Sequence, residues 1–154
     1  MKKALTGAAL LLSLLASASA FAQERSLREV AGAVASAERK AIVADRMQLD
    51  EEESREFWPI YNEYLDAHEA LDEKLAELLR TLAREFETLD DETADRLLED
   101  YHEFREERLA LRWKTARQLR KKFGAKRAGR FYQIENKLDT LTDMDLVKAV
   151  PLVR

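Results

Sequence analysis

The 154-residue chain has no cysteine, and it contains only two prolines and four glycines. Without cysteine it has no disulfide framework, no thiolate zinc site and no cysteine nucleophile. So little glycine and proline argues against turn-rich all-β folds and against collagen-like chains. With 46% hydrophobic and 36% charged residues, the composition favours one small helical domain.

Sequence motifs for catalysis are also missing. The chain has no glycine-rich phosphate loop, no His-Glu-x-x-His and no Gly-x-Ser-x-Gly sequence. No nucleophile, base and orienting group occur together at a recognisable spacing. An enzyme is therefore the least favoured class of function.

The first 22 residues have the features of a secretory signal peptide. Lys2 and Lys3 precede a short apolar run over residues 4–16, and Ala20-Phe21-Ala22 provides a small-x-small cleavage site. A retained membrane anchor would need about 20 apolar residues, which is longer than this run. We predict cleavage after Ala22 and a soluble exported protein over residues 23–154, with no transmembrane segment.

Capping patterns and apolar periodicity predict four helices. Ser26 to Glu29 has the form of a capping box and starts the first helix, which should end near Asp45 to Gln48. Asp50 and Glu53 form a second box at the start of a long helix. Pro59 lies inside this helix, so we expect a kink between Arg55 and Pro59.

The third helix should follow Asp90 or Asp91 and stop at Gly124, a typical residue at a helix C-terminus. A fourth helix follows and ends before Pro151. The second and third helices are long, and the short turn between them requires an antiparallel hairpin. The expected fold is a single all-α domain of four helices, built around this long hairpin with its kink near Pro59.

Charge is strongly segregated along the chain. Residues 50–92 contain sixteen acids and four bases, whereas residues 108–134 contain ten bases and no acid. In the predicted hairpin the acidic start of the second helix lies beside Arg117, Arg120, Lys121 and Lys122, and we favour this intramolecular charge matching. Export argues against a nucleic-acid partner, but anionic lipid headgroups or acidic client segments stay open as partners.

Only two histidines occur, and each has a carboxylate four residues later. His68 precedes Asp72, and His102 precedes Glu106. Such pairs share a helix face and can offer two ligands to Zn²⁺ or Ni²⁺. One histidine and one acid do not complete a tetrahedral site, so two solvated or ion-paired histidines are the favoured interpretation.

An aromatic cluster begins the second helix with Phe57, Trp58 and Tyr61, followed by Tyr64. Successive helical side chains are about 100° apart, so consecutive large residues cannot all face one core. Either Trp58 packs on another helix, or the cluster forms an exposed apolar rim for a dimer partner or an unfolded client.

Three short segments carry a family resemblance. Leu49-Asp50-Glu51-Glu52-Glu53 is similar to the Leu-Thr-x-x-Gln motif of the periplasmic Spy/CpxP group and its zinc- or nickel-linked relatives, with Asp for Thr and Glu for Gln. Residues 57–64 (FWPIYNEY) and 130–139 (RFYQIENKLD) resemble blocks of uncharacterised exported proteobacterial proteins. A second motif copy is expected at residues 123–127, where the sequence does not match.

The resemblance implies an ATP-independent periplasmic chaperone or envelope-stress accessory that binds partly unfolded proteins as a cradle-shaped homodimer. In this role Phe57, Trp58, Tyr61 and Tyr64 would make apolar contacts, and the four basic residues from Arg117 to Lys122 would meet acidic client segments. Two alternatives stay open. One is a metal-responsive sensor or buffer that uses His68, Asp72, His102 and Glu106, and the other is an adaptor for the periplasmic domain of a sensor kinase.

Overall fold

The computed structural model describes residues 36–153. The predicted signal peptide (residues 1–22) and the predicted helix start at Ser26 lie outside the described residues. The chain divides into two units, Met1–Lys40 and Ala41–Arg154. In the first unit the description covers residues 36–40, which are helical; the contacts below all belong to the second.

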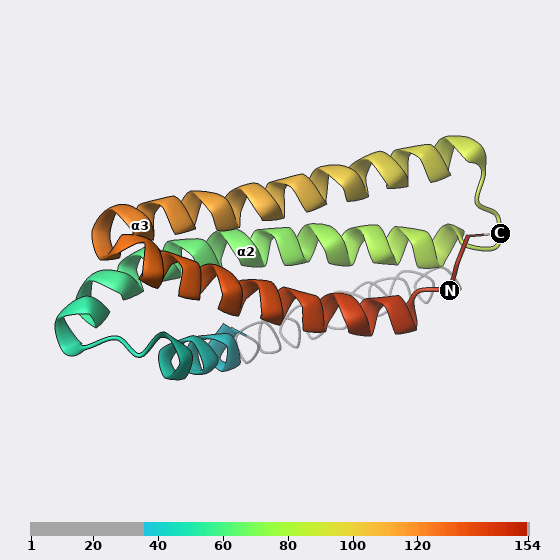
Figure 1. The fold of residues 1–154 in the computed structure, drawn as a ribbon. Helices are drawn as coiled ribbons and strands as arrows, with labels where there is room; N and C mark the ends of the chain where they lie inside the picture. The colour runs from blue at the N-terminus through green and yellow to red at the C-terminus, as the bar shows by residue number, and fades with distance from the viewer. Residues whose placement is uncertain (1–35, 154) are drawn as a thin grey trace, which may run out of the picture. The chain divides into compact units, whose positions relative to one another are not determined.

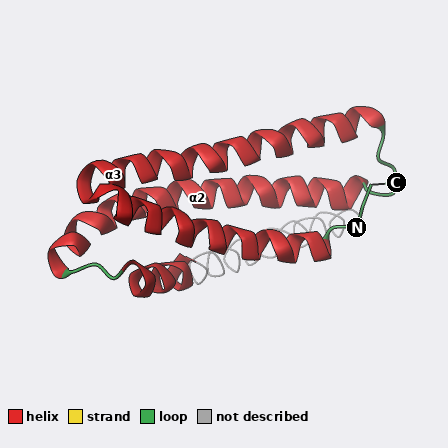
Figure 2. Cartoon of the chain, in the orientation of Figure 1, coloured by secondary structure: helices red, strands yellow, loops and turns green. Residues whose placement is uncertain are grey.

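The described residues form three helical elements and no strand, so the all-α prediction is confirmed (Figures 1 and 2). A first helix covers residues 36–47, α2 covers Glu51–Glu85 and α3 covers Asp91–Ala149. The predicted count of four is wrong, because the expected third and fourth helices form one element, α3. Across residues 36–153, none of the helices combines the length and apolar character that crossing a membrane requires.

Helix caps lie where the sequence predicts them. The Asp50 carboxylate accepts a hydrogen bond from the Glu53 amide at 2.8 Å, and the Glu53 carboxylate accepts one from the Asp50 amide at 3.2 Å. Asp90 caps α3 by accepting from the Thr93 amide at 2.8 Å. Helix α2 continues through Pro59, and the kink there stays a prediction.

Gly124 interrupts α3. Its backbone has φ 81° and ψ 171°, which is not helical, and it separates a first half (residues 91–123) from a second half (residues 125–149). Arg105 bonds Asp143 at 2.8 Å and Arg112 bonds Asn136 at 2.7 Å. Each of these pairs is equidistant from Gly124 along the chain, so the second half runs back beside the first.

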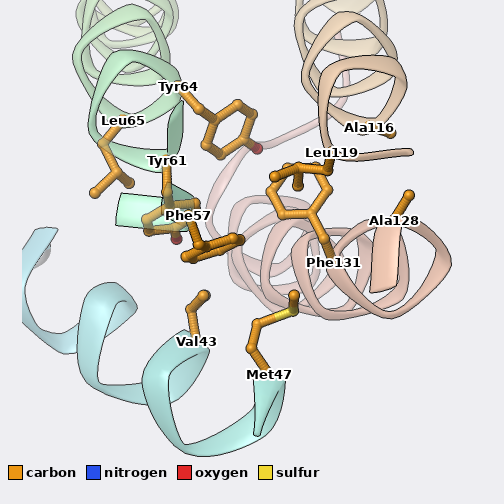
Figure 3. Close-up of a cluster of buried hydrophobic side chains, with 10 residues drawn as sticks. All are labelled: Val43, Met47, Phe57, Tyr61, Tyr64, Leu65, Ala116, Leu119, Ala128 and Phe131. Carbon is orange, nitrogen blue, oxygen red and sulfur yellow. The ribbon is translucent and has the colours of Figure 1, made fainter. Parts of the chain in front are cut away.

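The core lies where residues 41–47, α2 and both halves of α3 meet (Figure 3). Its buried apolar side chains are Val43, Met47, Phe57, Tyr61, Tyr64, Leu65, Ala116, Leu119, Ala128 and Phe131. Ion pairs of Glu56 with Lys122 at 3.3 Å and of Lys74 with Glu107 at 3.0 Å join α2 to the first half of α3. The early part of α2 therefore pairs with the late part of that half.

Two glycine substitutions test the bend. The backbone region of Gly124 is almost restricted to glycine, so Gly124→Ala should lower the free energy of unfolding by about 1–3 kcal/mol. Gly129 has a helical backbone with open space around an added Cβ, and Gly129→Ala should raise stability by about 0.5–1 kcal/mol. Urea unfolding followed by far-UV circular dichroism measures both changes. Equal stability of the two variants would contradict the assigned bend.

The cap of α3 should depend on pH. The hydrogen bond from the Thr93 amide holds the pKa of the Asp90 carboxyl below its usual 3.8. Ionised Asp90 therefore stabilises α3 above pH 3.8, and this contribution is lost as the pH falls through the lowered pKa. Asp90→Asn keeps a capping oxygen that does not titrate. The Thr93 amide signal should follow the carboxyl in an NMR titration of the wild type and lose that transition in the variant.

Candidate functional site

Most of the aromatic cluster proposed for client contact lies in the core. Phe57 and Tyr61 are fully buried and Tyr64 is 2% exposed. Phe57 stacks on Tyr61 with ring centroids 5.4 Å apart, and Tyr64 meets Phe131 of α3 edge-on, also at 5.4 Å. The expected exposed rim is therefore corrected for Phe57, Tyr61 and Tyr64, because their rings fill the contact between α2 and α3.

Trp58 lies at the margin of the same core. It is half-buried and packs against the core cluster. Its ring meets Phe57 and Tyr61 edge-on, with centroids 5.2 Å and 5.7 Å away. Both ring partners belong to α2, so the packing of Trp58 on another helix stays a prediction.

A fully buried carboxylate joins α2 to the second half of α3. The side chain of Glu135 is 0% exposed and accepts hydrogen bonds from the hydroxyls of Tyr61 and Tyr64, both at 2.9 Å. Each tyrosine reaches a different carboxylate oxygen. A buried carboxylate is costly unless hydrogen bonds compensate its lost hydration, and these two bonds tie its position to α2.

One turn further along α3, Asp139 meets a buried histidine. His68 Nε2 lies 3.3 Å from Asp139 Oδ1, and His68 Nδ1 lies 3.0 Å from Asp72 Oδ2. Both ring nitrogens of His68 therefore face carboxylate oxygens, one on α2 and one on α3.

Two arginines of the first half of α3 converge on Asp139. Arg108 Nη2 lies 2.9 Å from Asp139 Oδ1, and Arg112 Nη2 lies 3.2 Å from Asp139 Oδ2. Burial opposes the charge on Arg108, but the hydrogen bond and charge of Asp139, together with Asp143, outweigh burial and raise its pKa. This buried network, which we call the polar ladder, comprises Tyr61, Tyr64, His68, Arg108, Arg112, Glu135 and Asp139.

The two histidine-carboxylate pairs lie in different surroundings. His68 is part of the buried polar ladder and contacts Asp72. The side chain of His102, by contrast, is 73% exposed, with Nε2 3.8 Å from Glu106 Oε1. Over residues 36–153, no three or more histidine and acid side chains are placed to hold one metal ion. The structure does not bring His68, Asp72, His102 and Glu106 together as a metal site.

Exposed apolar side chains follow one face of the first half of α3. Leu98, Tyr101, Leu109 and Trp113 are between 44% and 66% exposed. Their spacing places them within one broad face of the helix. We call this set the α3 apolar strip. Apolar residues gathered on an exposed face are typical of a surface that contacts another chain.

A groove lies between the two halves of α3 at the end of this strip. Its volume is about 390 Å³. Trp113 and Tyr132 both line it, and their rings meet edge-on with centroids 6.5 Å apart. Small residues line it too, namely Ala116, Ala125, Ala128 and Gly129. We call this feature the bend groove, because the residues that line it come from both sides of the bend at Gly124.

Unpaired cations border the bend groove. Arg117 and Arg120 line it, and neither they nor Lys121 form an ion pair within the described part of the chain. Lys122, by contrast, pairs with Glu56 at 3.3 Å, and Arg127 pairs with Glu53 at 2.7 Å. Of the four predicted cations, Lys122 therefore forms the expected pair with the acidic start of α2, and Arg127 adds a pair that was not predicted. Arg117, Arg120 and Lys121 stay exposed.

Sequence reasoning missed the polar ladder and the role of Trp113. Glu135 and Asp139 are four residues apart and share a helix face with Phe131, so an acid pair on an apolar face was the available signal. Trp113 is 49% exposed, although its apolar side chain would suit a helix core. How far Trp113 is exposed depends on the bend at Gly124, because the bend places Tyr132 of the second half of α3 beside it.

Comparisons with protein-family models, with curated proteins and with solved structures found no match to this chain.

Removing the carboxylate at the centre of the ladder should strongly destabilise the protein. Asp139→Ala removes the buried negative charge that faces Arg108, Arg112 and His68, which should cost about 3–5 kcal/mol. Asp145→Ala removes an exposed acid that pairs with Lys148 at 3.5 Å and should change stability by less than about 0.5 kcal/mol. Urea unfolding measures both, and a loss of similar size in the two variants would refute the central role of Asp139.

Proposed function

We propose that this chain is an exported binding protein, an ATP-independent chaperone or envelope-stress accessory that holds partly unfolded proteins in the periplasm. The observation that carries the proposal is the exposed α3 apolar strip, with unpaired Arg117, Arg120 and Lys121 beside it. A surface that combines apolar side chains with cations can bind unfolded segments weakly and release them without ATP.

This proposal keeps the chaperone function expected from the sequence but assigns the apolar client contacts to different residues. Leu98, Tyr101, Leu109 and Trp113 replace the aromatic cluster of α2 as apolar contacts, since Phe57, Tyr61 and Tyr64 are buried. Arg117, Arg120 and Lys121 keep their role toward acidic segments. Membership of the Spy/CpxP group is part of this proposal, and so are the homodimer and the periplasmic location, which rest on the resemblance and on residues 1–22.

The long antiparallel hairpin predicted from the short turn is also proposed, formed by α2 and the first half of α3. The pairing of Glu56 with Lys122 and of Lys74 with Glu103 and Glu107 supports it. In such a hairpin, one helix can be buried while a face of the other stays exposed for clients. We prefer this binding role to a metal sensor, because His68 is engaged by Asp72 and Asp139.

Light scattering tests the proposal on protein produced with its own leader and recovered from the periplasm of a Gram-negative host. At near-stoichiometric ratios and without ATP, the protein should slow the aggregation of a reduced or chemically unfolded client. The double variant Arg117→Glu/Arg120→Glu should protect less, because its cations no longer meet acidic segments. Mass spectrometry of the same sample should show loss of residues 1–22.

A matched control separates local contacts from net charge. Arg55→Glu/Arg84→Glu makes the same change in charge on α2, where both arginines are exposed, and it should protect as well as the wild type. Thermal melts establish that both variants fold. The proposal fails if the wild type gives no protection, or if the two double variants lose protection equally.

A further inference from the structure

The bend groove offers a more specific role than the exposed strip. Its volume of about 390 Å³ is at the small end of the range of about 300–1,000 Å³ for ligand pockets. A groove of this size takes one or two side chains and is too small for a folded domain. A binding partner would therefore enter it as a short segment.

The lining of the groove indicates the chemistry of that segment. Trp113 and Tyr132 present aromatic surface, and the small side chains of Ala125 and Gly129 leave the space between the halves of α3 open. An added Cβ at Gly129 would meet nothing within 4 Å. The interior therefore suits an apolar side chain, whose burial is favourable by about 1.5–3 kcal/mol when complete.

The arginines at the groove indicate which residues of the partner segment lie next to this apolar side chain. The guanidinium groups of Arg117 and Arg120 have no acid partner within the described residues, and arginine binds carboxylates through two parallel hydrogen bonds. From these observations, and resting on the function proposed above, we infer that the bend groove anchors an apolar side chain of a client polypeptide with glutamate or aspartate beside it.

Charge also favours a client segment over a lipid surface. The chain carries 30 acids and 26 bases, so the molecule as a whole is repelled by an anionic bilayer. The free cations act at short range, because the Debye length is about 8 Å at physiological salt. A short acidic segment gains their attraction without facing the acidic surface of α2.

Isothermal titration calorimetry with synthetic peptides tests this inference on the full exported protein. The probe is a short peptide with a central phenylalanine flanked by glutamates, compared with a glutamine counterpart. Gly129→Leu fills the groove from a helical position and should weaken binding of the acidic peptide about tenfold, the equivalent of one buried apolar side chain. Ala110→Leu adds the same side chain at an exposed position of α3 outside the groove and should leave binding unchanged.

The contribution of the arginines is measured separately. The glutamine peptide should bind about threefold more weakly than the acidic peptide, as for exposed charge pairs. That preference should vanish in Arg117→Gln/Arg120→Gln. If the preference survives in the double variant, the assignment of Arg117 and Arg120 to the flanking acids is overturned.

The outcomes keep the groove distinct from the chaperone function. If Gly129→Leu binds the peptide like the wild type while the client is still protected from aggregation, the groove is not the anchor and the chaperone proposal stands. If peptide binding is lost on filling the groove but the wild type never protects a client, the groove is supported and the chaperone proposal fails. Displacement of the acidic peptide by phosphatidylglycerol vesicles, or blocking of the groove by self-association in sedimentation, would overturn the client assignment.

Discussion

Two buried carboxylates on one face of α3 set the relative positions of the packed helices. Glu135 is held by Tyr61 and Tyr64 of α2, while Asp139 meets His68 of α2 and Arg108 and Arg112 of the first half of α3. Apolar contacts tolerate a shift of one helix along another, because dispersion and burial have little direction. These polar contacts do not, since a buried hydrogen bond or ion pair is lost when its two groups move apart. We therefore ascribe the register of α2 and both halves of α3 to the polar ladder.

This register determines the surface as well as the core. When Arg112 lies opposite Asn136, the following turns place Trp113 against Tyr132 and bring Arg117 and Arg120 toward the small residues after Gly124. Large side chains at Ala125 or Gly129 would fill the space between the two halves. The groove thus has two causes. The polar ladder sets how the two halves of α3 lie against each other, and the small residues after Gly124 leave space between them.

Local features of the fold could be predicted from the sequence because they depend on neighbouring residues. The Asp50 and Asp90 caps and the non-helical backbone at Gly124 each follow from capping or backbone preferences within a few residues. The direction of α3 after Gly124 depends on partners far away in sequence, above all Arg108 and Asp139. Helical periodicity contains no information about such pairs. The count of four helices failed at this point, because one bent element replaces two separate ones.

The same limit explains why the proposed binding residues lie on α3 and not on α2. A helical wheel shows that Phe57, Trp58 and Tyr61 cannot all face one core, and the sequence therefore left two alternatives, an exposed aromatic rim or packing of Trp58 on another helix. The fold instead surrounds these rings with the first helix on one side and α3 on the other, so that Phe57 and Tyr61 are both buried (Figure 3).

On α3, by contrast, Leu98 and Leu109 are more than half exposed. A protein that must bind unfolded chains and stay folded needs its strongest apolar residues inside and weaker, charge-bordered ones outside. The partition between α2 and α3 meets both requirements. Burial of the aromatic cluster is therefore compatible with the proposed role, because it stabilises the scaffold on which the exposed face of α3 is held.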